Sequence, residues 1–456
     1  MRLQNHYVEQ KQDEYDRVDI DPQNLPHLQD VDNIVNKRMF SLGHYLKDPA
    51  ARRRIPGAAV LVRKDNRVVH LGCYGYANLE TGEQITPYTL FDLGSVSKQF
   101  TAYAVMGLLI INAITEKTVL SEIFEGLPLY ADRITIGDLI HHTAGLPQYW
   151  DILIGARDLK EQWYEEALRT SDHWYPFMSR RARRENSNSD VMNWLASQKL
   201  LAQDPDVEFD YSNTGYVILA EVVKAVAGVR FADYVQEGIF DPIEMKDSYV
   251  FDEQSKFRKT ATQVRNHAKC YNRVKGYGYV PVGYTPLNFI CGDGNVHSNI
   301  LDLAKWDAHL HRLDYRSMCS TNKARRLEAE HVRDLLWDPI RLKNRKRADY
   351  GAGWFLARQK YEANVTEGGQ LVKKKFETHG EYHNGEWLGF RSFILRAARW
   401  EIPKGDREID PETWDSLGII VLTNNHQFKP GPIAQEISQL FWGKNKRDNI
   451  INTFDY

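Results

Sequence analysis

The chain has 456 residues, with 59 Lys and Arg against 61 Asp and Glu, so its formal net charge is -2. A balance this close to neutral gives no electrostatic case for a nucleic acid or an acidic membrane surface as a partner. The hydrophobic fraction of 42% and the aromatic fraction of 12% suffice for a packed core, which excludes wholesale disorder.

The opening residues and the cysteines favour a cytoplasmic protein. The stretch MRLQNHYVEQKQDEYDRVDIDPQN holds no apolar segment typical of a secretory signal. The sequence contains no apolar run of about 18 residues or more, the length needed to span a membrane. The four cysteines are scattered without CxxC spacing, so neither a disulfide framework nor a zinc site is expected. Secretion stays open if the N-terminus has been processed.

The first part of the chain predicts a lead-in, a helix and a hairpin. Residues 1–49 are expected to be a polar lead-in followed by a helix, whose apolar residues recur at helical spacing between Val31 and Leu42. The next segment, IPGAAVLVRKDNRVVHLGCYGYAN, holds two apolar runs separated by Lys64-Asp65-Asn66, a turn sequence typical of a hairpin. A second helix is expected to follow Ser95 and to run to about Leu109.

Residues 112–290 are predicted to form a helical lobe inserted in the α/β part. A short helix in ITIGDLIHHTAGLPQY is expected to stop before Gly145, and YSNTGYVILAEVVKAVAG predicts an amphipathic helix that ends at Gly228. Residues 150–200 combine tryptophans with the basic run SRRARRE. We expect this run to be a solvated face and the tryptophans to be core of the lobe, with the wall of an acyl pocket as the alternative.

The last third of the chain returns to β character. Strands are expected in YGAGWFLAR, WLGFRSFIL and LGIIVLTNN, with a helix in PIAQEISQLFW and an exposed connection at VKKKFE. Strands at both ends with helices between them predict one α/β (α+β) unit over residues 50–445. Residues 446–456 would be a tail.

The stretch TLFDLGSVSKQFTAYAVMGLLI places Ser95 and Lys98 at the start of an apolar helix. Residues three apart share a helix face, so Lys98 can reach the Ser95 hydroxyl. A desolvated lysine has a lowered pKa and can act as a base for a serine nucleophile. The alternative is an N-cap serine with a surface lysine. A second Ser-x-x-Lys, at Ser320, precedes no apolar helix and is taken as chance.

Two further triads carry chemistry. Tyr211-Ser212-Asn213 precedes a helix, where the tyrosine can relay a proton and the asparagine can orient a lysine and a substrate carbonyl. His383-Asn384-Gly385 stands at the entrance to a strand, where a glycine lets a substrate lie against the strand edge. Taken separately, a core tyrosine with an asparagine cap, and a structural histidine, are the alternatives.

The three motifs in this order resemble the serine β-lactamase and penicillin-binding protein superfamily, in particular its class C-like branch. That branch includes family VIII carboxylesterases, D-aminopeptidases and transesterases. Segments similar to that family fall in order over about residues 50–445, and they include GYGYANLETGEQITPYTLFDLGSVSKQFTA, ITIGDLIHHTAGLP, FDYSNTGYVILAEVV, GDGNVHSNILDLAKW and YGAGWF. The resemblance implies an antiparallel sheet built from N- and C-terminal strands, flanked by helices, with an inserted all-helical lobe.

The resemblance also implies roles for single residues. Ser95 would be the acylated nucleophile, Lys98 its activating partner, and Tyr211 a base that protonates the leaving group. Asn213 would position the site. The N–H groups of Ser95 and Glu386 would form the oxyanion hole. Which of Lys98 and Tyr211 takes the first proton stays open.

The third motif departs from the family pattern because no Lys-Thr-Gly occurs. A lysine there suits a substrate carboxylate, and His383 suits one less. Together with Gly385 and Glu386, His383 is expected to bind the substrate, while the Glu386 carboxylate is expected to point away. We therefore expect a serine hydrolase that acts on a carboxylic ester or a small peptide or amide, without metal or cofactor. The alternatives are a biosynthetic transesterase or acyltransferase, a weak β-lactamase, and a non-catalytic ligand-binding homologue.

Two other motifs are given structural roles. The adjacent His141 and His142 would face different directions on a helix, so a metal site is not expected. The glycine-rich CGDGNVHSN lacks the following Lys-Ser/Thr of a phosphate loop, and its Gly292, Asp293 and Gly294 are expected to line the site. Oligomeric state cannot be read from the sequence.

Overall fold

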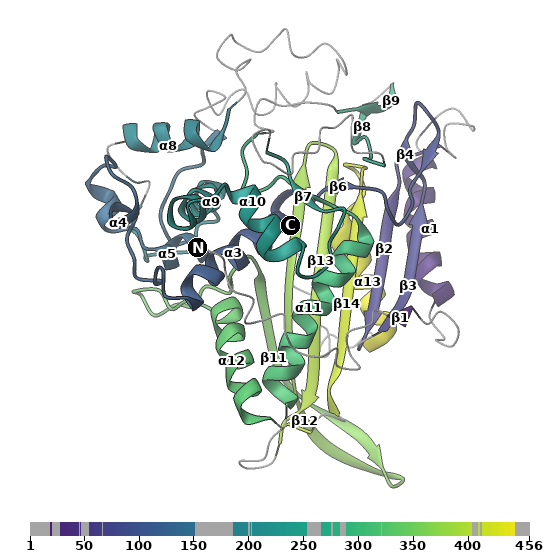
Figure 1. The fold of residues 1–456 in the computed structure, drawn as a ribbon. Helices are drawn as coiled ribbons and strands as arrows, with labels where there is room; N and C mark the ends of the chain where they lie inside the picture. The colour runs from purple at the N-terminus through teal and green to yellow at the C-terminus, as the bar shows by residue number, and fades with distance from the viewer. Residues whose placement is uncertain are drawn as a thin grey trace.

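The computed structural model describes most of the chain in one α/β unit (Figure 1). The described residues are 19–20, 28–44, 46, 54–65, 67–150, 186–198, 201, 203–252, 266–274, 277–282, 289–320, 322–403, 409–410 and 413–442. The basic run at 180–184, Trp163, Trp174 and the tail at 446–456 lie outside them. Among the described residues, no helix combines the length and the hydropathy needed to cross a membrane.

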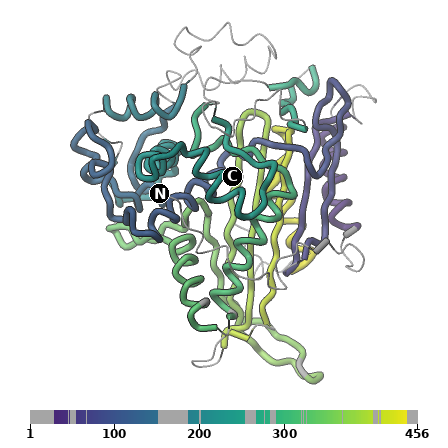
Figure 2. Tube along the Cα trace, viewed as in Figure 1, coloured from purple at the N-terminus to yellow at the C-terminus, as the bar shows by residue number. Residues whose placement is uncertain are grey.

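The main sheet collects strands from both ends of the chain. Its seven strands lie in the order β1-β3-β2-β14-β13-β12-β11. All neighbours are antiparallel except the two-residue β1, which is parallel to β3. Figure 2 shows the N-terminal strands beside the C-terminal ones. The strands are β1 (Asp19–Ile20), β2 (Ala58–Lys64), β3 (Arg67–Tyr74), β11 (Phe355–Glu367), β12 (Gln370–Trp387), β13 (Phe390–Glu401) and β14 (Asp415–Thr423). This confirms the predicted antiparallel sheet.

Both faces of the sheet are covered. Along β2, Ala58, Val60 and Val62 pack in one cluster with α1 (Leu28–His44) and α13 (Pro430–Trp442), and Ala59 and Leu61 pack in the cluster that contains α3 (Lys98–Ile110). Successive side chains of a strand point to opposite faces. A strand with helices on both faces is therefore apolar on both faces, as β2 is from Ala58 to Val62.

The helices of the α3 side come mostly from the middle of the chain, as predicted. They are α4 (Leu120–Ile123), α5 (Ile136–Ile140), α8 (Asn188–Ser197), α9 (Asn213–Ala227), α10 (Phe231–Val235), which continues into a π-helical turn at Gln236–Phe240, α11 (Ile300–Cys319) and α12 (Lys323–Trp337). A 3-10 turn lies at Leu129–Asp132. Gly228 ends α9 in the left-handed conformation, with φ 71°.

Short strands outside the main sheet accompany these helices. They are β4 (Tyr76–Asn78), β5 (Glu83–Gln84), β6 (Phe91–Asp92), β7 (Tyr249–Val250), β8 (Tyr271–Val274), β9 (Gly278–Pro281) and β10 (Val296–Ser298). β10 pairs with both β6 and β7. Through β10, the segment just before Ser95 is joined to residues about 200 positions later in the chain.

One predicted connection is wrong. VKKKFE, residues 372–377, belongs to β12 and pairs with β11 along its whole length. β13 pairs only with residues 376–387 of β12, so the outer part of the β11–β12 hairpin extends beyond the sheet (Figure 1). Exposure alternates along this segment: Lys373 and Lys375 are exposed, whereas Lys374 between them is partly buried, which is the pattern of a two-stranded ribbon in water rather than of a loop.

Candidate active site

The Ser95 turn is held between α3 and strand β12. It is a 3-10 turn over Gly94–Ser97 that leads directly into α3. Gly94 has φ 52°, and a Cβ built on it would lie 2.7 Å from the Glu386 nitrogen. Only glycine combines this left-handed conformation with so close an approach. Just before the turn, the Leu93 carbonyl accepts a hydrogen bond from Ser392 Oγ at 2.6 Å.

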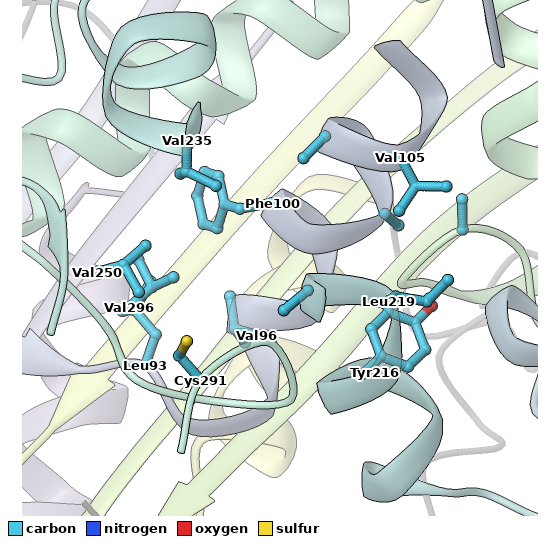
Figure 3. Close-up of a cluster of buried hydrophobic side chains, with 14 of the residues drawn as sticks. Leu93, Val96, Phe100, Val105, Tyr216, Leu219, Val235, Val250, Cys291 and Val296 are labelled. Atoms are coloured by element: carbon cyan, nitrogen blue, oxygen red, sulfur yellow. The ribbon is translucent and has the colours of Figure 1, made fainter. Parts of the chain in front are cut away.

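The turn and α3 are anchored in a continuous apolar cluster. Figure 3 shows Leu93 and Val96 among buried side chains that include Val296 and Cys291, with Phe100 of α3 close to Val235. α3 is buried on nearly every side, which explains why its sequence is apolar around the whole helix. The Ser95 hydroxyl is therefore carried by a rigid part of the core.

The Lys98 ammonium is fully buried and makes three hydrogen bonds. Its Nζ donates to Ser95 Oγ at 3.0 Å, to Asn213 Oδ1 at 2.6 Å and to the Asp293 carbonyl at 2.8 Å. Burial lowers the pKa of Lys98 to about 7, and the Asp293 carboxylate opposes this shift. An amine with this pKa is often neutral near pH 7, and the neutral amine can accept the Ser95 proton.

The ring of Tyr211 lies against Lys98. The Lys98 Nζ is 4.9 Å from the Tyr211 ring centroid and 5.6 Å from that of Tyr216. Burial raises the pKa of Tyr211 well above its usual value, while an interaction with Ser95 opposes the rise. The Tyr211 hydroxyl is buried, and within the described residues no partner meets the usual hydrogen-bond geometry.

Tyr211 and Asn213 flank the start of α9. The Ser212 side chain caps the helix by accepting the Gly215 N–H. Gln148 spans the segment, since its Nε2 donates to the Tyr211 carbonyl at 2.7 Å and its Oε1 accepts from the Asn213 N–H at 3.1 Å. Asn213 can therefore present its Oδ1 to Lys98 from a fixed backbone.

The glycine-rich loop expected to line the site does contact Lys98. The Asp293 carbonyl accepts from Lys98, and the Tyr149 hydroxyl donates to Asp293 Oδ2 at 3.1 Å. The Gly292 carbonyl accepts from Thr101 Oγ1 at 2.6 Å, which ties the loop to α3. Burial raises the pKa of the Asp293 carboxyl, and the charge of Lys98 opposes the rise.

His383 is buried, neutral and bonded at both ring nitrogens. Its Nδ1 lies 2.6 Å from the Asn384 carbonyl and must carry the proton, because a carbonyl only accepts. Its Nε2 lies 3.0 Å from the Tyr350 hydroxyl and must then accept. Burial, followed by the charge of Lys98, lowers the pKa of His383 to about 3. In this structure both ring nitrogens are bonded within the protein, one of them to a tyrosine, and the binding of substrate by His383 stays a prediction.

Gly385 lets β12 approach the Ser95 turn. A Cβ on Gly385 would overlap the Leu93 carbonyl oxygen and the Ser392 hydroxyl. Glu386 follows Gly385 in β12, so its side chain points to the opposite face of the strand from the position of Gly385. There it pairs with Arg391, with Nη2 to Oε1 at 2.7 Å, so the carboxylate points away from the site as expected.

The two adjacent histidines contact different segments. His141 Nδ1 donates to the Tyr350 carbonyl at 2.9 Å, and His142 packs against Tyr211 with ring centroids 4.3 Å apart. Among the residues that the structure describes, no group of three or more His, Cys, Asp or Glu side chains is placed to hold a metal ion.

The fold thus gathers the predicted site residues at one place and adds two. Ser95, Lys98, Tyr211 and Asn213 form one contact group, and His383, Gly385 and the Glu386 backbone border it on β12. Tyr350 and His142 were not predicted as site residues. Both residues lie in sequence segments that resemble the family, but the sequence of these segments does not show which side chains Tyr350 and His142 contact.

A family model described as Beta-lactamase matches residues 31–437. The chain belongs to the Beta-lactamase family. This confirms the resemblance to the serine β-lactamase and penicillin-binding protein superfamily. The identity of the family rests on nearly the whole described chain rather than on the Ser-x-x-Lys tetrad alone.

Curated relatives include penicillin-binding proteins and D-aminopeptidases. The chain is 27% identical over 350 residues to a penicillin-binding protein of Bacillus subtilis, which covers 74% of this chain and 64% of the relative. It is 27% identical over 234 residues to a D-aminopeptidase of Brucella anthropi, which covers 49% of this chain and 39% of the relative. The matched regions thus span less than two thirds of these relatives.

Solved structures share the fold at low identity. An octameric penicillin-binding protein homologue from Pyrococcus abyssi superposes with a TM-score of 0.60 at 22% identity, covering 92% of this chain and 79% of that one. FmtA from Staphylococcus aureus gives a TM-score of 0.59 at 17% identity, covering 94% and 95%. These likenesses support the fold.

Gly385→Ala tests the close approach of β12 to the Ser95 turn. The new methyl group would overlap the Leu93 carbonyl and force the strand and the turn apart. A displacement of about 1 Å at a reacting group costs on the order of 10²-fold in rate. We expect kcat/KM for a p-nitrophenyl ester to fall by about that factor. The control is Gly238→Ala, whose Cβ would meet nothing nearer than 4.0 Å. Equal activity of the two variants would contradict the prediction.

Proposed function

We propose that the protein is a serine hydrolase that forms an acyl-enzyme on Ser95 and acts on a neutral carboxylic ester or small amide. The observation that carries the proposal is the 3.0 Å contact between Ser95 Oγ and the fully buried Lys98 Nζ. A lysine has little reason to be fully buried beside a serine unless its reduced basicity is used, since burying the charge costs several kcal/mol.

In the proposed reaction, Ser95 Oγ attacks the substrate carbonyl carbon as its proton passes to Lys98 or Tyr211. The carbonyl oxygen takes the negative charge, and the N–H groups of Ser95 and Glu386 stabilise it. The bond from carbon to the leaving oxygen or nitrogen then breaks, and the leaving group takes up the proton. Water attacks the acyl group in turn, which releases the acid and restores the Ser95 hydroxyl. Protein groups supply every proton transfer, so the scheme calls for no metal ion or cofactor.

The charge around Ser95 supports a neutral substrate. The Lys98 ammonium can donate three hydrogen bonds, and all three go to protein acceptors. His383 is neutral, and both of its nitrogens are bonded within the protein. A substrate carboxylate held at either residue would have to break one of these bonds.

Relatives named as D-aminopeptidases, together with a solved D-amino acid amidase from Ochrobactrum anthropi at 16% identity, support an amide as the second substrate class. A transesterase would use the same acyl-enzyme and differ only in the acceptor that attacks it. We propose hydrolysis because water is the acceptor that needs no further binding site.

Ser95→Ala tests the nucleophile. We expect one fluorophosphonate adduct per wild-type chain by intact-mass spectrometry and none on the variant. Turnover of p-nitrophenyl esters should fall at least about 10³-fold, because triad-type nucleophiles are lost to that extent on truncation. Ser320→Ala, at the other Ser-x-x-Lys, is the matched control. Ester turnover that survives in Ser95→Ala would refute the mechanism.

The pH dependence of acylation tests the role of Lys98. Below its pKa of about 7 the amine is protonated and cannot accept the Ser95 proton. We therefore expect kcat/KM to rise with pH through about 7 and then to level off. Burial also raises the pKa of Asp92 to about 7, so Asp92→Asn is measured in parallel. This variant should show the same rise of kcat/KM with pH. A kcat/KM of the wild type that does not change with pH, or the loss of its rise in Asp92→Asn, would contradict the assignment of this pH dependence to Lys98.

Paired substrates test the preference for neutral groups. A small amide or ester and its analogue with a free carboxylate on the leaving group are compared at equal chain length. The neutral member should have a kcat/KM at least about ten-fold higher, because one unmatched charge in a buried site costs more than 1 kcal/mol. A higher kcat/KM for the anionic member would overturn the substrate assignment while leaving Ser95 as nucleophile.

A further inference from the structure

His142 forms a hydrogen bond to the backbone on each side of Tyr211. Its backbone carbonyl accepts the Asp210 N–H at 2.8 Å, and its ring Nδ1 accepts the Ser212 N–H at 3.0 Å. Tyr211 lies between these two bonded residues. One residue therefore fixes the backbone immediately before and immediately after the tyrosine.

The His142 ring also contacts the Tyr211 ring. The two centroids are 4.3 Å apart with an interplanar angle of 36°, and the rings of Tyr216 and Tyr350 also contact the imidazole, with centroid distances of 4.9 Å and 4.5 Å. His142 is 1% exposed, so no water competes for these contacts. The imidazole thus limits both the backbone and the side-chain position of Tyr211.

The hydrogen bond fixes the state of the imidazole. Because Nδ1 accepts from a backbone N–H, the neutral ring carries its proton on Nε2. Burial lowers the pKa of His142 well below its usual value, and the charge of Lys98 adds to the effect. A protonated ring would put an N–H where Nδ1 now accepts and would break the bond to Ser212.

The backbone of His142 is itself in an uncommon conformation. Its φ of 58° is left-handed, a conformation that is unfavourable for residues other than glycine and asparagine. A glycine at this position would adopt the left-handed conformation without strain, but it would lack the imidazole ring. Such strain persists where the surrounding structure holds it, often at functional sites.

We infer that His142 is a positioning residue that holds Tyr211 in place for proton transfer at Ser95. It acts through two hydrogen bonds that straddle the tyrosine. This inference rests on the proposed function and goes beyond it, because it assigns a role to a histidine that touches neither Ser95 nor the substrate carbonyl.

Two variants that both tolerate a left-handed backbone separate the role of the ring from that of the backbone. His142→Gly keeps the carbonyl bond to Asp210 and removes the acceptor for Ser212. His142→Asn keeps that acceptor, because its Oδ1 takes the place of Nδ1. We expect kcat for a p-nitrophenyl ester to fall about 10- to 100-fold in His142→Gly with KM within about two-fold of wild type. His142→Asn should recover most of the loss. If His142→Gly does not fold, His142→Ala takes its place.

A double-mutant cycle with Tyr211→Phe tests whether His142 acts through the tyrosine. The rate of fluorophosphonate labelling of Ser95 is the readout, since it stays measurable when turnover is weak. In the Tyr211→Phe background, His142→Gly should change this rate less than about two-fold. The buried His311 lies in α11, away from the Ser95 group, and His311→Asn serves as the control for a loss of stability alone, with melting temperatures recorded for all variants.

Three outcomes would overturn the inference while Ser95→Ala remains inactive. They are a kcat of His142→Gly close to wild type, a loss in His142→Asn equal to that in His142→Gly, and a His142→Gly effect that persists undiminished without the Tyr211 hydroxyl. If Ser95→Ala instead retains activity, the proposed function fails first and the cycle does not apply.

Discussion

The structure is organised around a buried ammonium group. Lys98 has no exposed surface, and an unpaired charge in such a place would cost several kcal/mol. Its three acceptors come from separate segments: Ser95 in the turn before α3, Asn213 at the start of α9, and the Asp293 carbonyl in a loop of the last half of the chain. The packing of the lobe on the sheet must bring all three to one point. The same geometry that satisfies the lysine also aligns the serine and the asparagine.

The two histidines closest to this centre are neutral, because burial lowers the pKa of each. His383 and His142 each use Nδ1 in a backbone hydrogen bond, but in opposite senses. His383 donates to the Asn384 carbonyl, whereas His142 accepts the Ser212 N–H. The two imidazoles therefore carry their protons on different nitrogens, and each is fixed in one tautomer. Tyr350 connects this shell to the rest of the lobe, because its hydroxyl donates to His383 and its carbonyl accepts from His141.

The sequence predicted the features that depend on interactions between residues close in the chain. The hairpin of β2 and β3, the end of α9 at Gly228 and the contact between Lys98 and Ser95 all depend on residues close in the chain, and all are present. The order of the family-like segments added the antiparallel sheet. Contacts between distant segments were not predictable from one sequence. Nothing near Tyr350 shows that it meets His383, and the three consecutive lysines of VKKKFE suit a loop as well as an exposed strand. The tyrosine that bonds to His383 Nε2 lies 33 residues away in the chain, and no local pattern identifies it.

The centre of the sheet is formed by the pairing of β2 with β14. Thr423 Oγ1 donates to the Gly57 carbonyl across a separation of 366 residues. β2 is apolar on both faces, so until β14 has been made it has one long edge without its native neighbour. Contacts of such separation slow folding because the loop must close before they stabilise anything. A chain still on the ribosome would hold the Ser95 segment early but could complete its support on β12 and β13 only near the end of synthesis. Until then β2 has an edge without a partner, which is the kind of edge that pairs wrongly with other strands, so the last strands of the chain protect one of the first.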